Sequence, residues 1–215
     1  MKTSHWPLFD LGVRAPDLEL RLPTDDELAA LIEVARAGIH DPSRMPFANP
    51  WTDRSSPGFE RAFMQWHWKG RADWHKDSWR LGLAVFVDGE PVGAQDVSGK
   101  RFSLFRTVES GSWLGAPYQG RGLGKQMRQA MLHFAFIGLG AKVARSSAWA
   151  DNEQSIGVSA SIGYETDGTD EAAPRGEVVD VVRFKLTKQA WLASSRPEVE
   201  IVGLEGCIDM FGAES

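Results

Sequence analysis

The chain has 215 residues, 42% hydrophobic and 25% charged, a composition typical of one globular domain with its own core. Its 24 Lys and Arg against 29 Asp and Glu give a formal charge of −5, which leaves no positive surplus to neutralise a nucleic-acid backbone. The single cysteine, Cys207, excludes an intrachain disulfide framework and a cysteine-rich zinc site. With no secretory leader and no stretch of about 18 apolar residues, we expect a cytoplasmic protein with neither a nucleic-acid nor a membrane partner.

The first predicted elements are a strand and a helix. The alternating run at residues 18–22 indicates the strand, and Thr24 followed by Glu27 is a capping box that opens a helix ending near Gly38. Residues 40–57 contain four prolines and no periodicity, which predicts an ordered loop or lid.

An aromatic segment follows, with five of the nine tryptophans between residues 51 and 79: Trp51, Trp66, Trp68, Trp74 and Trp79. Aromatic residues at helical spacing predict a second helix over 58–76, and we expect most of them to pack this helix on a sheet and the rest to line an acceptor pocket. His67 and His75 stand eight residues apart without an acid pair, so no metal site is expected. The dipeptide Asp88-Gly89, between two strand-like runs, predicts a tight hairpin.

The second half predicts alternating strands and helices. Strands are expected at 107–115, 142–149, from Tyr164 and at 177–186, with helices from Leu123 to Gly138 or Gly140 and through Ile162. In the first of these helices, Lys125, Arg128, Gln129 and His133 occupy faces outside the apolar stripe. The pattern predicts a mixed α/β fold, a single domain over 1–215 with a core of about 18–190 and a C-terminal extension over 191–215.

The stretch Gln119–Lys125 places three glycines between a strand and an amphipathic helix. Such a turn lets backbone approach a ligand closely, and the helix N-terminus offers unpaired N–H groups to a phosphate. A Walker loop would need glycine at 119 and Ser or Thr at 126, and both positions are Gln. A dinucleotide fingerprint would need glycine at 125 or 127, where Lys125 and Met127 stand.

The turn fits the pattern Q/R-x-x-G-x-G/A, and further pieces lie at the expected places around it: Glu109-Ser-Gly111-Ser-Trp113-Leu114, Tyr118-Gln-Gly120-Arg-Gly122, His133-Phe134, Asn152-Glu-Gln-Ser155 and Gly163-Tyr164. Together they resemble the GCN5-related N-acetyltransferases (GNAT), and within them the RimJ/RimL-like ribosomal-protein N-acetyltransferases. The match runs from about residue 80 to 186. The resemblance implies a mostly antiparallel twisted sheet with helices on both faces, in which a splayed parallel strand pair holds acyl-coenzyme A.

It also implies a set of coenzyme A-binding residues, whose backbone would hold the pyrophosphate and the pantetheine arm: Trp113, Leu114, Gln119, Gly120, Arg121, Gly122, Leu123, Gly124, Lys125, Asn152 and Ser155. Asn152 also has the alternative role of a helix N-cap. No metal is implied.

Acyl transfer to an amine needs a base for the amine proton and an acid, or water, for the leaving thiolate. On the resemblance, Glu109 is the expected base, a half-buried carboxylate with a raised pKa, and its alternative is a solvent-facing strand residue. Ser155 is expected near the thioester sulfur. Many family members place a tyrosine acid where Ser159 stands here, so a tyrosine acid is not expected.

We therefore expect an N-acyltransferase that moves acetyl, or another short acyl group, to a primary amine of a peptide, protein or small molecule. A non-catalytic acyl-CoA sensor and an unrelated phosphate-binding protein remain alternatives. An acidic acyl chain such as succinyl would need a basic residue in the acyl pocket, with His67, Arg71 and His75 as candidates. The apolar tail over 197–215 predicts either an extra edge strand or a homodimer contact.

Overall fold

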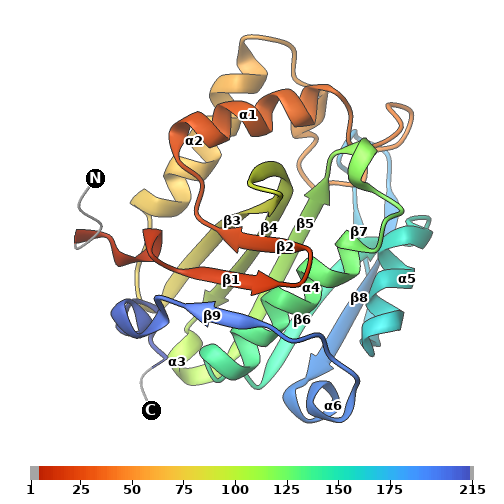
Figure 1. Ribbon diagram of the computed structural model, residues 1–215. Coiled ribbons are helices and arrows are strands. Elements are labelled where there is room, and N and C mark those ends of the chain that lie inside the picture. The colour runs from red at the N-terminus through yellow and green to blue at the C-terminus, as the bar shows by residue number, and fades with distance from the viewer. Residues whose placement is uncertain (1–4, 214–215) are drawn as a thin grey trace.

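Among residues 5–213, which the computed structural model describes, a nine-stranded sheet runs through the molecule (Figure 1). Its strands are β1 (Gly12–Ala15), β2 (Leu18–Arg21), β3 (Ser78–Val87), β4 (Glu90–Lys100), β5 (Thr107–Leu114), β6 (Val143–Trp149), β7 (Glu165–Ala172), β8 (Val179–Thr187) and β9 (Glu200–Val202). The order across the sheet is β7-β8-β6-β5-β4-β3-β2-β1-β9. Neighbouring strands are antiparallel except β5 and β6, which are parallel. The mixed, mostly antiparallel sheet predicted from the sequence is confirmed.

Six α-helices accompany the sheet in the described chain: α1 (Asp25–Arg36), α2 (Gly58–Ala72), α3 (Phe102–Phe105), α4 (Leu123–His133), α5 (Glu153–Ile162) and α6 (Lys188–Ala193). Figure 1 shows α1 and α2 together at the top of the view, α4 lower and in front of the sheet, and α5 at the right. No helix within residues 5–213 is long and apolar enough to cross a membrane.

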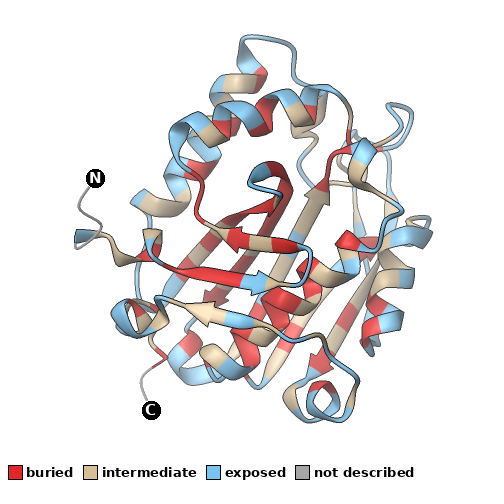
Figure 2. Ribbon diagram, in the orientation of Figure 1, coloured by how far each residue is buried: buried red, intermediate tan, exposed pale blue. Residues whose placement is uncertain are grey.

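Strand alternation divides the core between the two faces of the sheet. In β3, Leu81, Leu83 and Val85 belong to the larger cluster, which also contains the apolar stripe of α4. Ala84 and Phe86 point the other way, into a smaller cluster with α1 and α2. Figure 2 shows these buried positions along the central strands and on one side of α4.

Two local features predicted from the sequence, the capping box of α1 and the turn between β3 and β4, are present in the structure. The Thr24 hydroxyl accepts a hydrogen bond from the Glu27 N–H at 3.2 Å, and the Glu27 carboxylate accepts one from the Thr24 N–H at 2.8 Å, which completes the capping box. Asp88 and Gly89 have φ of 52° and 84° at the turn between β3 and β4. The sequence analysis did not anticipate β1, α3 or α6, and the helix expected to reach residue 76 ends at Ala72.

The C-terminal segment packs on its own domain. β9 pairs with β1 through Val13↔Ile201 and its neighbours, and the side chains of Cys207 and Phe211 are fully buried. Phe211 contacts the rings of Trp74, Trp79 and Phe134 at centroid distances of 5.2, 5.0 and 5.7 Å. The tail therefore covers its apolar residues as an edge strand. The apolar residues that predict a homodimer contact thus find cover within the chain, and the homodimer itself stays a prediction.

Truncating Phe211 to Ala should lower the free energy of unfolding by about 3–5 kcal/mol, because it leaves a cavity inside an aromatic cluster. Urea unfolding followed by tryptophan fluorescence measures the change. Phe105→Ala is the matched control, because Phe105 is 54% exposed and should change stability by less than about 0.5 kcal/mol. Equal stabilities for Phe211→Ala and the parent would show that the tail is not part of the core.

Candidate functional site

The parallel strands β5 and β6 pair over three residues and then separate. Their last shared register is Glu109↔Arg145. Beyond it β5 stays paired with β4 as far as Leu114, and β6 stays paired with β8 as far as Trp149. Within the described chain, the facing edges of these two strand ends share no ladder, which leaves main-chain groups of a kind that an extended ligand can pair with.

The predicted glycine turn lies at the end of β5. Gly120 and Gly122 have φ of 70° and 82°, and Gly122 is the N-cap of α4, with no side chain to cover the N–H groups of the first turn. A Cβ added to Gly124 would meet a single heavy atom within 4 Å, the Leu114 Cδ1 at 4.0 Å. The turn thus combines uncapped backbone N–H groups with open space, which are the features that an anion requires of a helix N-terminus.

The side chain of Gln119 fixes this turn. Its Nε2 donates to the carbonyl oxygens of Leu114 at 2.8 Å and Ile39 at 2.6 Å, tying the turn to β5 and to the segment after α1. Arg121 and Lys125 are exposed at the surface of the turn. The exposed surface of this turn is therefore formed mainly by backbone, and anion binding there stays a prediction.

At the neighbouring helix, Asn152 is the N-cap of α5. Its Oδ1 accepts the Ser155 N–H at 3.1 Å, so the helix-capping role expected for it is present. Ser155 is half-buried, and its carbonyl accepts a hydrogen bond from the buried Ser159 hydroxyl at 3.0 Å. These residues lie just after the free end of β6.

Glu109 lies at the last paired register of β5, but its side chain is exposed and not half-buried as the sequence analysis expects. On the neighbouring strand β4, Asp96 stands opposite Gly111, two residues further along β5 and on the same face as Glu109. The sequence analysis did not identify Asp96.

The side-chain carboxylate of Asp96 accepts a main-chain N–H of the neighbouring strand β5. Its Oδ1 accepts the Gly111 N–H at 2.5 Å, while the buried Gln95 donates from Nε2 to the carbonyls of Asp96 and Gly111, each at 3.0 Å. Burial raises the pKa of Asp96 to about 6, against the opposing effects of the Gly111 hydrogen bond and the charge of Arg80. A carboxyl group that titrates near neutrality thus lies next to the strand separation.

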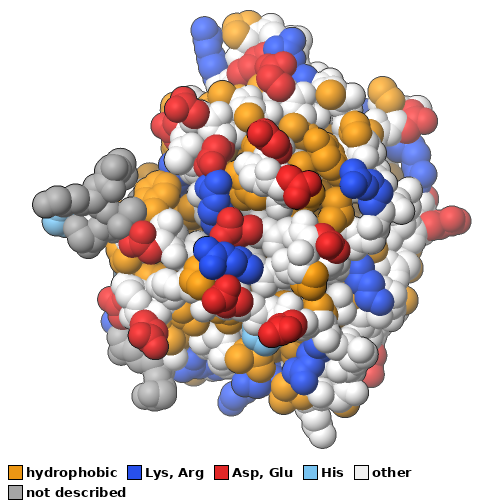
Figure 3. All heavy atoms as spheres, in the orientation of Figure 1, with side chains coloured by type: hydrophobic (Ala, Val, Ile, Leu, Met, Phe, Trp, Pro, Cys, Tyr) orange, Lys and Arg blue, Asp and Glu red, His pale blue; other side chains and the backbone are white. Residues whose placement is uncertain are grey.

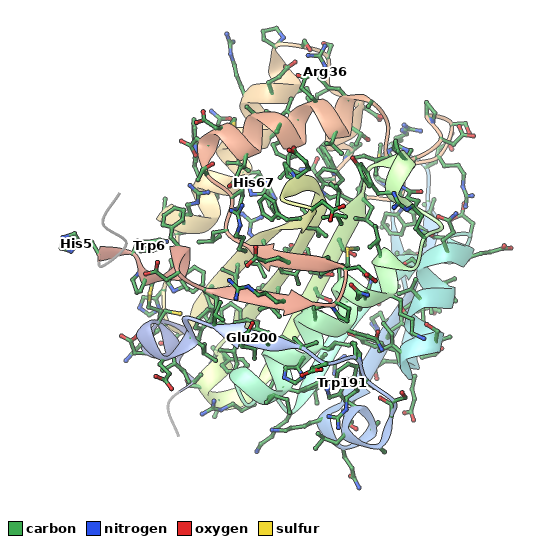
Figure 4. All side chains as sticks on the ribbon, in the orientation of Figure 1. His5, Trp6, Arg36, His67, Trp191 and Glu200 are labelled. Carbon is green, nitrogen blue, oxygen red and sulfur yellow. The ribbon has the colours of Figure 1, made fainter. Side chains whose placement is uncertain are left out.

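Aromatic rings cover this face. Trp51 contacts Phe59, Phe63 and Trp113, each with ring centroids 5.8 Å apart, so the loop after α1 is ordered against β5. His67 of α2 points to the sheet and is buried (Figure 4), and burial together with nearby arginines lowers its pKa to about 3. It is therefore neutral at physiological pH.

The other tryptophans have separate roles. Trp74 and Trp79 pack around Phe211, whereas Trp66 and Trp68 are 41% and 45% exposed. The guanidinium of Arg80 lies 3.6 Å over the Trp66 ring. Most of the tryptophans therefore support packing, and Trp51 is the one in contact with Trp113 of β5.

One expectation about α4 is wrong. Arg128 was expected on a face outside the apolar stripe, but its side chain is only 5% exposed and donates from Nη1 to the hydroxyls of Ser146 at 3.2 Å and Ser159 at 3.4 Å. It stands four residues after Gly124, on the same face of the helix as the glycine that faces Leu114. The four-residue spacing from Gly124 is the feature of the sequence that could have indicated that Arg128 faces the sheet.

Residues 5–213 bring together no group of three or more His, Cys, Asp and Glu side chains suited to a metal ion. The arrangement instead combines an anion-binding turn, two separated strand ends and carboxylates on one face.

Comparison with known proteins places this geometry in context. The family model for the acetyltransferase (GNAT) domain matches residues 17–165. Among solved structures, a probable acetyltransferase is 20% identical, covers 82% of this chain and 96% of its own, and has a TM-score of 0.67. A GNAT-family acetyltransferase from Bacillus anthracis is 18% identical, with coverages of 83% and 99% and a TM-score of 0.66. RimL, a ribosomal L7/L12 alpha-N-protein acetyltransferase in complex with coenzyme A, is 19% identical, with coverages of 80% and 95% and a TM-score of 0.63.

The Asp96 carboxyl makes stability depend on pH. Because its folded-state pKa of about 6 lies above the ordinary value of 3.8, the folded chain binds the proton more tightly than the unfolded chain. Stability is therefore greatest below about pH 4 and falls as pH rises through 6, by on the order of 2–3 kcal/mol from this group. Asp96→Asn keeps an acceptor for Gly111 and should remove this contribution.

Urea unfolding of the parent and of Asp96→Asn between pH 4 and pH 8 measures the effect. The variant should gain stability relative to the parent as pH rises. A difference that stays constant across this range would contradict the raised pKa.

Proposed function

This chain belongs to the GNAT acetyltransferase family, and on that premise we propose that it transfers an acetyl or other short acyl group from coenzyme A to a primary amine of a protein N-terminus, a lysine or a small molecule. The observation that carries the proposal is the open glycine turn at the end of β5, next to the point where β5 and β6 separate. A non-catalytic acyl-CoA sensor is the alternative.

The turn fits the phosphate end of coenzyme A. Space beside Gly124 is open where a side chain would stand, and the first-turn N–H groups of α4 follow directly after Gly122. These features are what a pyrophosphate needs from a protein backbone. We propose that the following residues contact coenzyme A: Trp113, Leu114, Gln119, Gly120, Arg121, Gly122, Leu123, Gly124, Lys125, Asn152 and Ser155.

The reaction is the attack of an amine nitrogen on the thioester carbonyl carbon. The new C–N bond forms, the C–S bond breaks with its electron pair on sulfur, and one amine proton passes to a base. Glu109 and Asp96 are the carboxylates on the face that we propose receives the amine. Asp96 meets the requirement of a half-buried carboxylate with a raised pKa. Glu109 is exposed, so an amine can reach its carboxylate more easily.

Ser155 is proposed to donate a hydrogen bond to the departing thiolate. Ser155 is half-buried at the start of α5, and its backbone N–H donates to Asn152, so the helix cap fixes the backbone that carries the hydroxyl. The hydroxyl has no hydrogen-bond partner among the described residues that would compete for its proton.

A protein N-terminus is the acceptor we place first, because one solved structure with this fold is named as a ribosomal L7/L12 alpha-N-protein acetyltransferase. Figure 3 shows acidic and basic side chains interspersed on the face in view, without a large area of one sign. The absence of a nucleic-acid partner stays part of the proposal and rests on the formal charge of −5. A cytoplasmic location and a homodimer remain parts of the proposal.

The coenzyme A site is tested most cleanly at Gly124. Gly124→Val fills open space without changing a left-handed residue, and valine is at least as favourable as glycine inside a helix, so the fold should keep its stability. Affinity for coenzyme A should fall by about tenfold or more, since phosphate hydrogen bonds to the first turn are worth about 1.5–3 kcal/mol each. Isothermal titration calorimetry measures it.

Gly157→Val is the matched control. Gly157 is also helical, lies in α5 and has no heavy atom within 4 Å of an added Cβ. The Gly157→Val variant should bind coenzyme A with the affinity of the parent. Unchanged affinity of Gly124→Val for coenzyme A would show that the pyrophosphate binds elsewhere.

The base is identified by comparing Asp96→Asn with Glu109→Gln. We expect kcat/KM to fall by about 10²–10⁴ in Asp96→Asn with acetyl-CoA and a panel of amines, and less in Glu109→Gln. In the parent, kcat/KM should fall below about pH 6, because the protonated Asp96 cannot accept a proton.

The larger loss in Glu109→Gln would instead make Glu109 the base. Full turnover in both variants would exclude both carboxylates. A parent that binds acetyl-CoA and turns over no amine would support the sensor.

A further inference from the structure

Immediately past the last shared register of β5 and β6, polar side chains from five segments converge on the α4 side of the sheet. They are Ser110 of β5, Arg128 of α4, Ser146 of β6, Ser159 of α5 and Tyr164, which precedes β7. Ser110 follows Glu109 and Ser146 follows Arg145, so both residues stand at the first position where β5 and β6 no longer pair with each other. We call these five residues the Arg128 cluster.

The Arg128 cluster holds a buried cation without a counter-ion. Arg128 has five N–H donors. Its Nη1 donates to two serine hydroxyls and its guanidinium interacts with the Tyr164 hydroxyl, but its buried Nε has no partner among the described residues. No carboxylate in that part of the chain lies within ion-pair distance of it. The charge of Asp96 acts on it only over a longer range. Burying an unpaired guanidinium is costly, which points to a missing anion.

Two hydroxyls of the cluster interact only within it. The buried Tyr164 hydroxyl interacts with Ser110 and Arg128, and neither the Tyr164 nor the Ser110 hydroxyl has a partner outside the cluster among the described residues. Burial raises the pKa of Tyr164, against the opposing effects of Arg128 and Ser110, so the phenol stays protonated and able to donate. A cation with an unpaired Nε, beside hydroxyls that have no acceptor outside the cluster, forms a set that a carboxylate, with its four acceptor lone pairs, would satisfy.

Position relates this cluster to the acyl donor. Arg128 is one helical turn beyond Gly124, about 6 Å further along α4 than the glycine proposed to face the pyrophosphate. The carboxylates on the acceptor side, Glu109 and Asp96, lie on the opposite face of the sheet. A group that reaches the cluster between the separated strands therefore belongs to the donor and not to the amine.

We propose that the acyl group this enzyme transfers ends in a carboxylate, as in a short dicarboxylic acyl thioester such as succinyl-CoA, and that the Arg128 cluster binds this carboxylate. The inference rests on the proposed function and specifies its donor. The distal carboxylate takes no part in the bond changes. The amine forms its C–N bond at the thioester carbon, the C–S bond breaks, and the proton passes to the base as before. The basic residue is Arg128, and not His67, Arg71 or His75.

An acetyl group would serve this site poorly. Its methyl group accepts no hydrogen bond, so the guanidinium Nε would remain buried and unsatisfied. A carboxylate would instead accept a charge-assisted hydrogen bond there. The cluster therefore selects the acyl chain by its charge.

The test compares succinyl-CoA, acetyl-CoA and free coenzyme A on the full chain, by calorimetry and by initial rates against one amine panel. The parent should bind and use succinyl-CoA at least about tenfold better than acetyl-CoA. Arg128→Met, which retains the length and apolar contacts of the side chain, should abolish this preference and still bind free coenzyme A. Arg61→Met, an exposed position of α2, should behave as the parent does.

Tyr164→Phe keeps the ring and removes only the hydroxyl, so it tests the cluster if Arg128→Met fails to fold. It should weaken succinyl-CoA binding by about tenfold and leave acetyl-CoA binding unchanged. Equal use of the two donors by the parent, or a succinyl preference that survives Arg128→Met or Tyr164→Phe, would overturn the assignment while leaving coenzyme A binding intact. Failure to bind any coenzyme A species would instead overturn the proposed function.

Discussion

Backbone hydrogen bonding between β5 and β6 governs the rest of the site. The two strands pair only through Glu109↔Arg145, after which each remains held by its other neighbour. Main-chain groups that leave a ladder must find other partners or face a ligand. The separated ends are therefore both a weakness of the sheet and the place where an extended substrate can lie. On β4, the side chains of Gln95 and Asp96 take over hydrogen bonds beside this point, which shows how irregular the ladder has become.

The two faces of the separated strands differ in chemistry. The α1 and α2 side carries Asp96 and Glu109 under a cover of aromatic rings, and it is suited to an amine that must lose a proton. The α4 side carries Arg128 with hydroxyl groups and no carboxylate partner in the described chain. On our proposal, the opposite charges of the two faces separate the amine from the acyl donor, and the glycine turn at the end of β5 holds the phosphate end of the donor.

The parts of the fold that are determined by residues close together in the sequence were predictable. The hairpin at Asp88-Gly89, the capping box at Thr24 and the glycine turn before α4 each carry their structural reason within a few residues. Resemblance to a family added the parallel strand pair, which no local pattern specifies. The fold-back of the C-terminal segment onto β1 was one of two open readings, because the choice depends on contacts almost the whole chain apart.

Two residues of the candidate site escaped the sequence analysis for the same reason. Arg128 reads as a surface residue, because its hydroxyl partners come from β6 and α5. Asp96 reads as one polar position in a strand, and its raised pKa arises from burial by other elements. Conversely, Glu109 was expected to be half-buried, but its side chain is exposed. Sequence motifs thus located the backbone of the site, whereas the electrostatics required the assembled fold.

The central claim is that the glycine turn and the separated strand ends bind an acyl-coenzyme A. Amide hydrogen exchange with and without acetyl-CoA measures this directly, residue by residue. Protection should appear at Trp113 and Leu114 on β5 and over residues 119–125, with little change in β1, β2 and β9. Unchanged exchange at the turn, or protection confined to another part of the molecule, would contradict the account.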